Sequence, residues 1–115
     1  MNVYDAAHQL ARSLSECPEY IAYKEAKEKV KQDLQAEKML NDLRTTQFEV
    51  QTLKLSGKPT DEAEKKLQNL YNIVSYNSLL QNYLEAEERF AVLFSDIQKI
   101  ILNRIELDIN LENNK

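Results

Sequence analysis

Between residues 78 and 107 the apolar side chains recur every three or four positions, which is the spacing of one helix face. One stripe follows three heptads of this segment, and a second stripe lies directly beside it. Together they form an apolar face wider than one neighbouring helix covers. The first stripe contains Leu79, Tyr83, Ala86, Phe90, Leu93, Ile97 and Ile100, and the second contains Leu80, Leu84, Ala91, Phe94, Ile101 and Ile105.

A helix with such a wide face needs packing partners on two sides, and a chain of 115 residues has few helices to supply them. We therefore expect one partner to be a second copy of the chain, as a homodimer or a higher oligomer. Leaving a stripe in water would forgo roughly 1.5–3 kcal/mol for each Phe or Leu side chain. The predicted oligomer interface consists of Leu79, Leu80, Tyr83, Leu84, Phe90, Phe94, Ile97 and Ile101.

The composition favours an all-α fold in one domain over residues 1–115. A single glycine and two prolines leave little room for hairpins or long loops, whereas the helix formers Lys, Glu, Gln, Leu and Ala are abundant. The hydrophobic fraction of 43% argues against a disordered chain, but the charged fraction of 30% leaves only a small core. Oligomerisation would enlarge that core.

Capping and breaking residues divide the chain into helices. Asn2, Asp33 and Thr60 stand where N-caps are needed. Pro18 separates the first two helices, because the residue before a proline avoids the helical region. Gly57 suits the left-handed position that ends a helix. The expected helices span residues 2–15, 18–32, 34–56, 60–75 and 78–107.

The break before the last helix is weaker. Asn77 can cap a new helix, but the sequence equally allows one helix to run through residues 75–78. The expected architecture is a helical bundle with two shorter N-terminal helices and a long antiparallel helical hairpin folded at residues 57–59, which self-associates through the last helix. The polar residues 110–115 are expected to be a disordered tail.

The sequence offers no set of residues that could carry a reaction. His8 and Cys17 are the only histidine and cysteine, and together they cannot furnish a structural zinc site. A single glycine excludes a glycine-rich loop that would cradle phosphates. We therefore predict no catalytic residue, no metal site and no cofactor, and we expect the protein not to be an enzyme.

One acidic position on the last helix stands apart. Glu85, Glu87 and Glu88 form a cluster, and such clusters are usually solvated or paired with neighbouring cations. Glu87, however, falls within the second apolar stripe. It is therefore a candidate for a partly buried contact with a partner.

The charge distribution argues against direct binding of nucleic acid. The net charge is −4, and the densest cationic stretch, residues 24–31, is interrupted by Glu25 and Glu28. A nucleic-acid-binding regulator is the alternative to a protein adaptor. The N-terminus lacks the basic and apolar regions of a signal peptide, and the longest apolar run, residues 90–94, is far too short to span a membrane. We expect a cytoplasmic protein without a membrane partner.

The order of several short segments resembles the YlbF/YmcA family of small helical bacterial regulators, and most closely its YheA-type branch. The resemblance covers nearly the whole chain. It rests on the run from Asn77 to Phe90 with the following residues 93–101, on Val3-Tyr4-Asp5-Ala6-Ala7 with Leu10 and Leu14, on Pro18-Glu19-Tyr20 with Lys24, and on Leu43-Arg44 with Gln47 ahead of Gly57.

The resemblance implies an all-helical, self-associating protein of a bacterial, mainly Gram-positive, cytoplasm. Relatives act as regulatory partners in competence, biofilm formation and sporulation, and associate with the RNA-decay endonuclease RNase Y. The YlbF and YmcA branches can carry extra cysteines linked to an iron–sulfur cluster. This chain departs from that pattern, because Cys17 stands alone. The expected function is that of a non-enzymatic regulatory adaptor.

Overall fold

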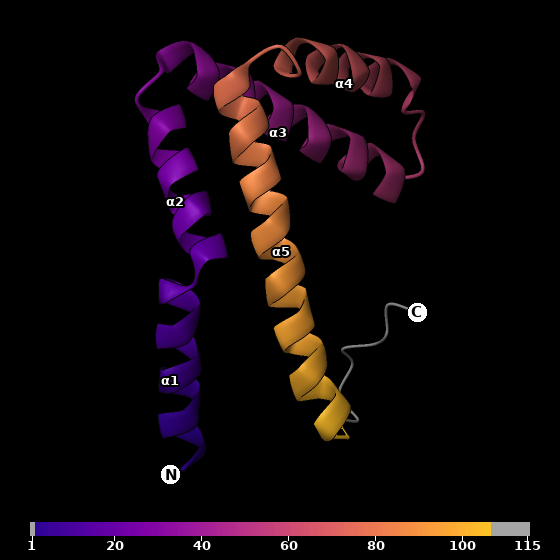
Figure 1. Ribbon diagram of the computed structural model, residues 1–115. Coiled ribbons are helices and arrows are strands. Elements are labelled where there is room, and N and C mark those ends of the chain that lie inside the picture. The colour runs from indigo at the N-terminus through magenta and orange to yellow at the C-terminus, as the bar shows by residue number, and fades with distance from the viewer. Residues whose placement is uncertain (1, 107–115) are drawn as a thin grey trace.

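The computed structural model describes residues 2–106, and this part of the chain contains five helices and no strand. The all-α fold class is therefore confirmed. The last helix ends before the expected Leu107, and the tail expected at residues 110–115 lies outside the described residues. The helices are α1 (Val3–Glu16), α2 (Pro18–Lys31), α3 (Leu34–Leu55), α4 (Asp61–Val74) and α5 (Ser78–Arg104) (Figure 1).

Side-chain N-caps begin three of the helices, and two of them, Asn2 and Asp33, are caps that the sequence predicts. The side-chain oxygens of Asn2 and Asp33 accept the backbone N–H three residues on, each at 2.9 Å. Asn77 Oδ1 accepts the backbone N–H of Leu80 at 3.0 Å. The question left open by the sequence is thereby answered: α4 ends at Val74, and α5 is a separate helix.

The turn after α3 reverses the chain. Gly57 has a φ of +71°, in the left-handed region that favours glycine. The N–H of Lys58 reaches the carbonyl of Leu53 at 3.0 Å, and the N–H of Gly57 reaches that of Lys54 at 3.1 Å, which is a Schellman ending. Helix α4 then returns beside α3 as the expected antiparallel hairpin (Figure 1). Thr60 occupies the N-cap position, but its hydroxyl donates to the Glu64 carboxylate instead of accepting a backbone N–H.

The core lies where the first half of α5 meets α2 and α3. Helix α5 makes its most extensive interhelix contact with α2, a pairing that the expected hairpin did not include (Figure 1). Four of the five helices contribute buried apolar side chains to this cluster. Its members are Ala26, Val30, Ala36, Leu43, Val74, Leu80, Tyr83 and Ala86.

The described chain is flat and extended. Its principal extents are 51, 37 and 15 Å, so it is little more than one helix thick. The radius of gyration is 18.0 Å, against about 13 Å for a compact domain of this length. Figure 1 shows why: α1 and the second half of α5 leave the core as two diverging arms. We call residues 92–105, which comprise the last part of α5 and its C-cap Ile105, the distal half of α5.

Candidate interaction surface

An aromatic seam holds the middle of α5 against α2. The ring of Phe90 lies 5.3 Å from that of Tyr20 and 6.1 Å from that of Tyr23, measured between centroids. Tyr23 also meets Tyr83 at 5.7 Å. Such aromatic pairs contribute about 0.5–1.5 kcal/mol each beyond their buried area. The seam therefore fixes α5 on α2 as far as Phe90, and Phe94 continues it at 6.2 Å with its ring partly in solvent.

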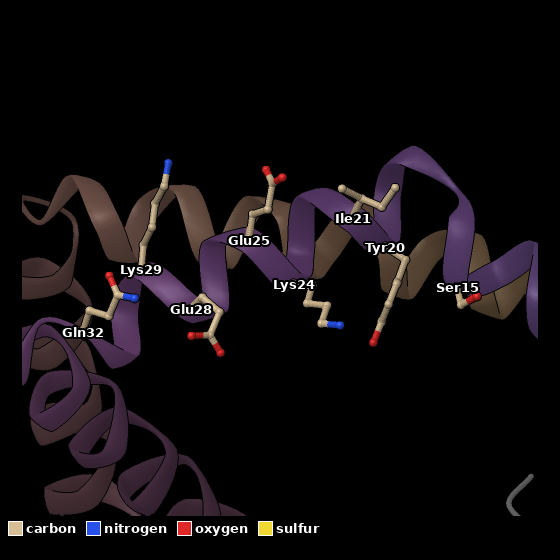
Figure 2. A pocket seen from close by; sticks show the side chains of 8 residues that line it. All are labelled: Ser15, Tyr20, Ile21, Lys24, Glu25, Glu28, Lys29 and Gln32. Atoms are coloured by element: carbon tan, nitrogen blue, oxygen red, sulfur yellow. The ribbon is translucent and has the colours of Figure 1, made fainter.

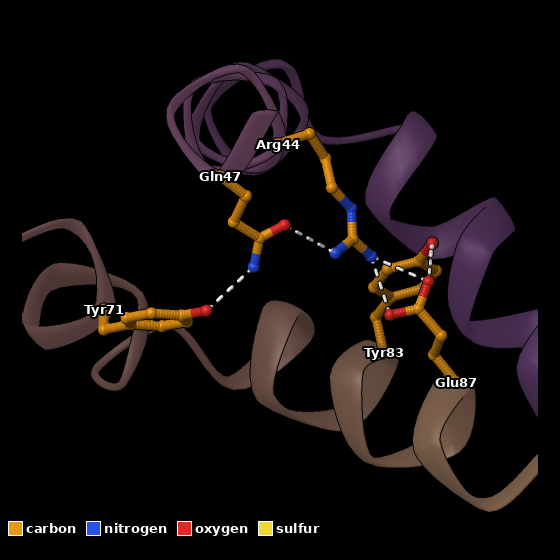
Figure 3. A network of polar contacts seen from close by, with 5 residues as sticks. All are labelled: Arg44, Gln47, Tyr71, Tyr83 and Glu87. Atoms are coloured by element: carbon orange, nitrogen blue, oxygen red, sulfur yellow. Dashed lines mark hydrogen bonds and ion pairs between the residues drawn. The ribbon is translucent and has the colours of Figure 1, made fainter. Parts of the chain in front are cut away.

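A polar network ties α3 to both later helices (Figure 3). Nη2 of Arg44 donates to both carboxylate oxygens of Glu87, at 2.6 and 2.7 Å, and the Tyr83 hydroxyl donates to the same carboxylate at 3.3 Å. On its other side Arg44 donates to the Gln47 side-chain oxygen at 3.2 Å, and Gln47 donates to the Tyr71 hydroxyl at 2.8 Å. The network therefore links α3 to α4 and to α5 through side-chain hydrogen bonds.

Burial and neighbouring charge alter the proton affinities in this network. Desolvation, hydrogen bonding with Tyr23 and the nearby Glu87 charge raise the pKa of Tyr83 to about 12, although Arg44 opposes the shift. The Tyr83 hydroxyl is protonated at neutral pH, as it would be at the ordinary pKa of 10.0, and it donates to Glu87. Desolvation by burial lowers the pKa of Arg44, but the hydrogen bonds and charges of Glu87 and Tyr83 outweigh it, so the pKa of Arg44 is raised overall.

Beyond the seam, α5 loses its cover. In the distal half the side chains of Val92, Phe94 and Ile101 are 51%, 42% and 47% exposed. Ile100, Leu102 and Ile105 are exposed as well. Phe94 and Ile101 lie on one side of the helix, and exposed apolar side chains gathered on one face mark interaction sites. The distal half of α5 is thus the main candidate interaction surface.

Helix α1 forms the second uncovered arm. It contains no buried residue, and its substantial contacts are with α2 alone. Its apolar side consists of Val3, Ala7, Leu10 and Leu14, of which Leu10 and Leu14 are half-buried and the other two are exposed. A helix of 14 residues without tertiary cover is marginal in water.

The eight residues predicted for an oligomer interface lie in three environments. Leu80 and Tyr83 are buried in the core of the single chain, and Leu79 and Leu84 pack against that core. Phe90 and Ile97 are half-buried, whereas Phe94 and Ile101 remain exposed. The first four therefore already have partners within the chain, and the apolar surface still open to a partner is the distal half of α5.

Glu87 is half-buried and paired, as the sequence led us to expect, but its cation is Arg44 of the same chain. The place of Glu87 within an apolar stripe indicated that its side chain is partly buried. No comparable signal pointed to Arg44, which lies 43 residues earlier. Nothing comparable pointed to α1 as a second uncovered arm, although its apolar periodicity was visible.

A surface hollow follows α2 and shows no cluster of one charge (Figure 2). Figure 2 shows Glu25 and Lys29 pointing to one side of the helix and Lys24 and Glu28 to the other. Opposite charges therefore alternate on both sides, which does not suit a phosphate backbone.

Residues 2–106 hold no group of three His, Cys, Asp or Glu side chains that could bind a metal ion. The thiol of Cys17, at the joint between α1 and α2, donates to the Leu14 carbonyl at 3.2 Å. None of the helices described is both long and apolar enough to cross a membrane.

Comparisons with known proteins agree with this architecture. A family model described as "Control of competence regulator ComK, YlbF/YmcA" matches residues 3–106. The chain is 40% identical to a UPF0342 protein of Clostridium tetani over the full length of both chains, and 33% identical to one of Streptococcus pneumoniae over 90% of this chain and 94% of the relative. A solved structure of a protein of unknown function (DUF964) from Bacillus stearothermophilus has the same fold, with a TM-score of 0.78 at 19% identity over 89% of this chain and 90% of that one.

Proposed function

The chain belongs to the YlbF/YmcA family, and we propose that it is a non-enzymatic regulatory adaptor that works through helix-mediated protein contacts. The family description, control of a competence regulator, supports a regulatory role. The proposal adds that the distal half of α5 makes the contacts, that the chain self-associates through it, and that the protein works in the cytoplasm.

The uncovered apolar face of the distal half of α5 carries the proposal. Phe94 and Ile101 lie on one side of this helix and are 42% and 47% exposed. An amphipathic helix face of this kind binds another helix or an apolar groove. The chemistry that this face offers is burial of apolar surface. Such a face suits an adaptor.

The cationic residues of α2 are poorly arranged for direct binding of nucleic acid. The cations of α2 alternate with glutamates, and Lys27 lies over the Tyr23 ring at 5.9 Å from its centroid. A nucleic-acid-binding regulator is therefore the second candidate. If the protein is an adaptor, any effect on RNA runs through a protein partner, such as the RNase Y complex that the family resemblance implies.

The test is affinity capture of tagged protein from a Gram-positive lysate, with and without nuclease, using the wild type and the Phe94→Glu variant. We expect protein partners that survive nuclease and are lost with Phe94→Glu. Phe48→Glu is the matched control, because Phe48 is 73% exposed on α3, away from the distal half of α5. Capture that depends on intact RNA would favour the second candidate.

A further inference from the structure

Two apolar arms of nearly equal length extend from one flat molecule. Helix α1 has 14 residues, and the helical part of the distal half of α5, residues 92–104, has one fewer, so each arm is roughly 20 Å long. Folded domains are built from at least two packed layers, whereas the described chain is only 15 Å thick. The arms therefore lack the layer that would cover them.

Both arms present faces without opposing charge. At 100° per residue, the side of α1 that carries Val3, Ala7, Leu10 and Leu14 lies away from all of its charged residues. The alanines on this side allow another helix to approach closely. On α5 the side with Phe94 and Ile101 lies away from Asp96 and Lys99, and Arg104 flanks it near the tip. Two such faces can pack without burying an unpaired charge.

Both arms leave the core at the same height along the length of α5. Tyr20 near the start of α2 packs on Phe90 of α5, at 5.3 Å between ring centroids. The base of α1, at Leu14, is therefore level with Phe94, and the two arms run in opposite chain directions from there to their tips (Figure 1).

We propose that α1 of one copy packs antiparallel against the distal half of α5 of a second copy, and reciprocally, so that the four arms of a twofold dimer form one helical bundle. This inference rests on the proposed self-association and adds its architecture. Rotation about a twofold axis parallel to the arms does not change the height of any residue along the arms. It brings Leu14 to Phe94 of the partner, Ala7 to Ile101 of the partner, and Val3 to Ile105 of the partner.

A second copy suits the geometry better than an unrelated helix for two reasons. A twofold contact covers both arms of both chains at once and closes on itself, which leaves no arm open. Each face measures roughly 20 by 10 Å, so four faces give about 800 Å² in projection. Interlocking side chains raise the accessible area above that value, toward the size of specific interfaces. The same contact explains why the apolar face of α5 is wider than one neighbour covers.

The test is a disulfide formed between two different chains, each in a Cys17→Ser background. One chain carries Ala7→Cys and a tag that changes its size, and the other carries Ile101→Cys. After mixing and mild oxidation, we expect a covalent product that contains one chain of each kind. Asn103→Cys is the matched control, because residue 103 lies on the opposite side of the helix. It should give at least about tenfold less of the mixed product. Val3→Cys with Ile105→Cys repeats the test at the exposed tips.

Each other outcome has a definite meaning. A dimer by light scattering without the mixed product at either pair would overturn the α1 contact and leave the proposed self-association standing. A monomer would overturn both. A single chain carrying Ala7→Cys and Ile101→Cys that closes on itself as a monomer would show that α1 covers its own α5, and that would also overturn the inference.

Discussion

Arg44 on α3 and Glu87 on α5, 43 residues apart in sequence, form an ion pair in which one guanidinium nitrogen contacts both carboxylate oxygens, at 2.6 and 2.7 Å. Their side chains are 39% and 36% exposed, so the pair is neither buried nor fully solvated. Because it joins two helices that are not neighbours in sequence, it helps to define how α5 leaves the core.

We predict a measurable coupling between these two residues. A double-mutant cycle with Arg44→Ala and Glu87→Ala, followed by denaturant unfolding, should give about 1 kcal/mol. The exposed Lys38–Asp42 pair within α3 is the control, with side chains 77% and 50% exposed. It should give less than about 0.5 kcal/mol. Equal coupling for both pairs would mean that the Arg44–Glu87 contact is no more than a surface pair.

The raised pKa of Tyr83 predicts a loss of stability in alkali. Its folded pKa is about 12 against an ordinary value of 10.0, so between those values the folded chain retains a proton that the unfolded chain releases. This contribution is complete below about pH 10 and disappears as the pH rises toward 12. The unfolding free energy should fall across that window more for the wild type than for Tyr83→Phe. Parallel pH profiles would refute the assignment.

Core and surface positions on α3 should respond differently to the same substitution. Leu43 is fully buried, so Leu43→Ala should lower the free energy of unfolding by about 2–5 kcal/mol. Leu34 on the same helix is 82% exposed, and Leu34→Ala should change it by less than about 0.5 kcal/mol. Chemical denaturation of the two variants measures both. Similar losses in the free energy of unfolding would mean that Leu34 is buried by something other than its own chain.

Direct binding of RNA should be weak. Gel shifts with unstructured and hairpin RNA at physiological salt should show no submicromolar complex, because phosphate contacts need clustered, unopposed cations. The variant Lys27→Glu with Lys31→Glu tests the densest cationic stretch. Tight binding by the wild type that weakens in this variant would favour a nucleic-acid-binding regulator.

The untagged protein should contain far less than one metal ion per chain. Cys17 and His8 are the only cysteine and histidine in the sequence, and they cannot complete a zinc or iron–sulfur site. Elemental analysis after purification without chelator measures this directly. A stoichiometric metal would reopen a redox role for the chain.

Local signals in the sequence predicted the helices, and distant contacts decided the rest. Gly57 and the caps at Asn2 and Asp33 act over three or four residues, so their effect could be read directly. The role of Asn77 was ambiguous, because the residues around it suit the capped start of a new helix and a continuous helix equally well. The Arg44–Glu87 pair and the α2–α5 seam depend on how helices far apart in sequence meet, which periodicity does not encode. For the same reason a stripe cannot tell the chain's own core from a partner's: Leu80 and Tyr83, two of the residues predicted for an oligomer interface, are buried within the single chain.

We expect the distal half of α5 to be covered by another chain. The decisive measurement is light scattering coupled to size-exclusion chromatography at micromolar concentration. We predict at least twice the chain mass of 13.4 kDa for the wild type and for Phe48→Glu. We predict dissociation for Phe94→Glu and Ile101→Glu, with circular dichroism to monitor the helices. A wild type that elutes as a folded monomer of 13.4 kDa would contradict this expectation.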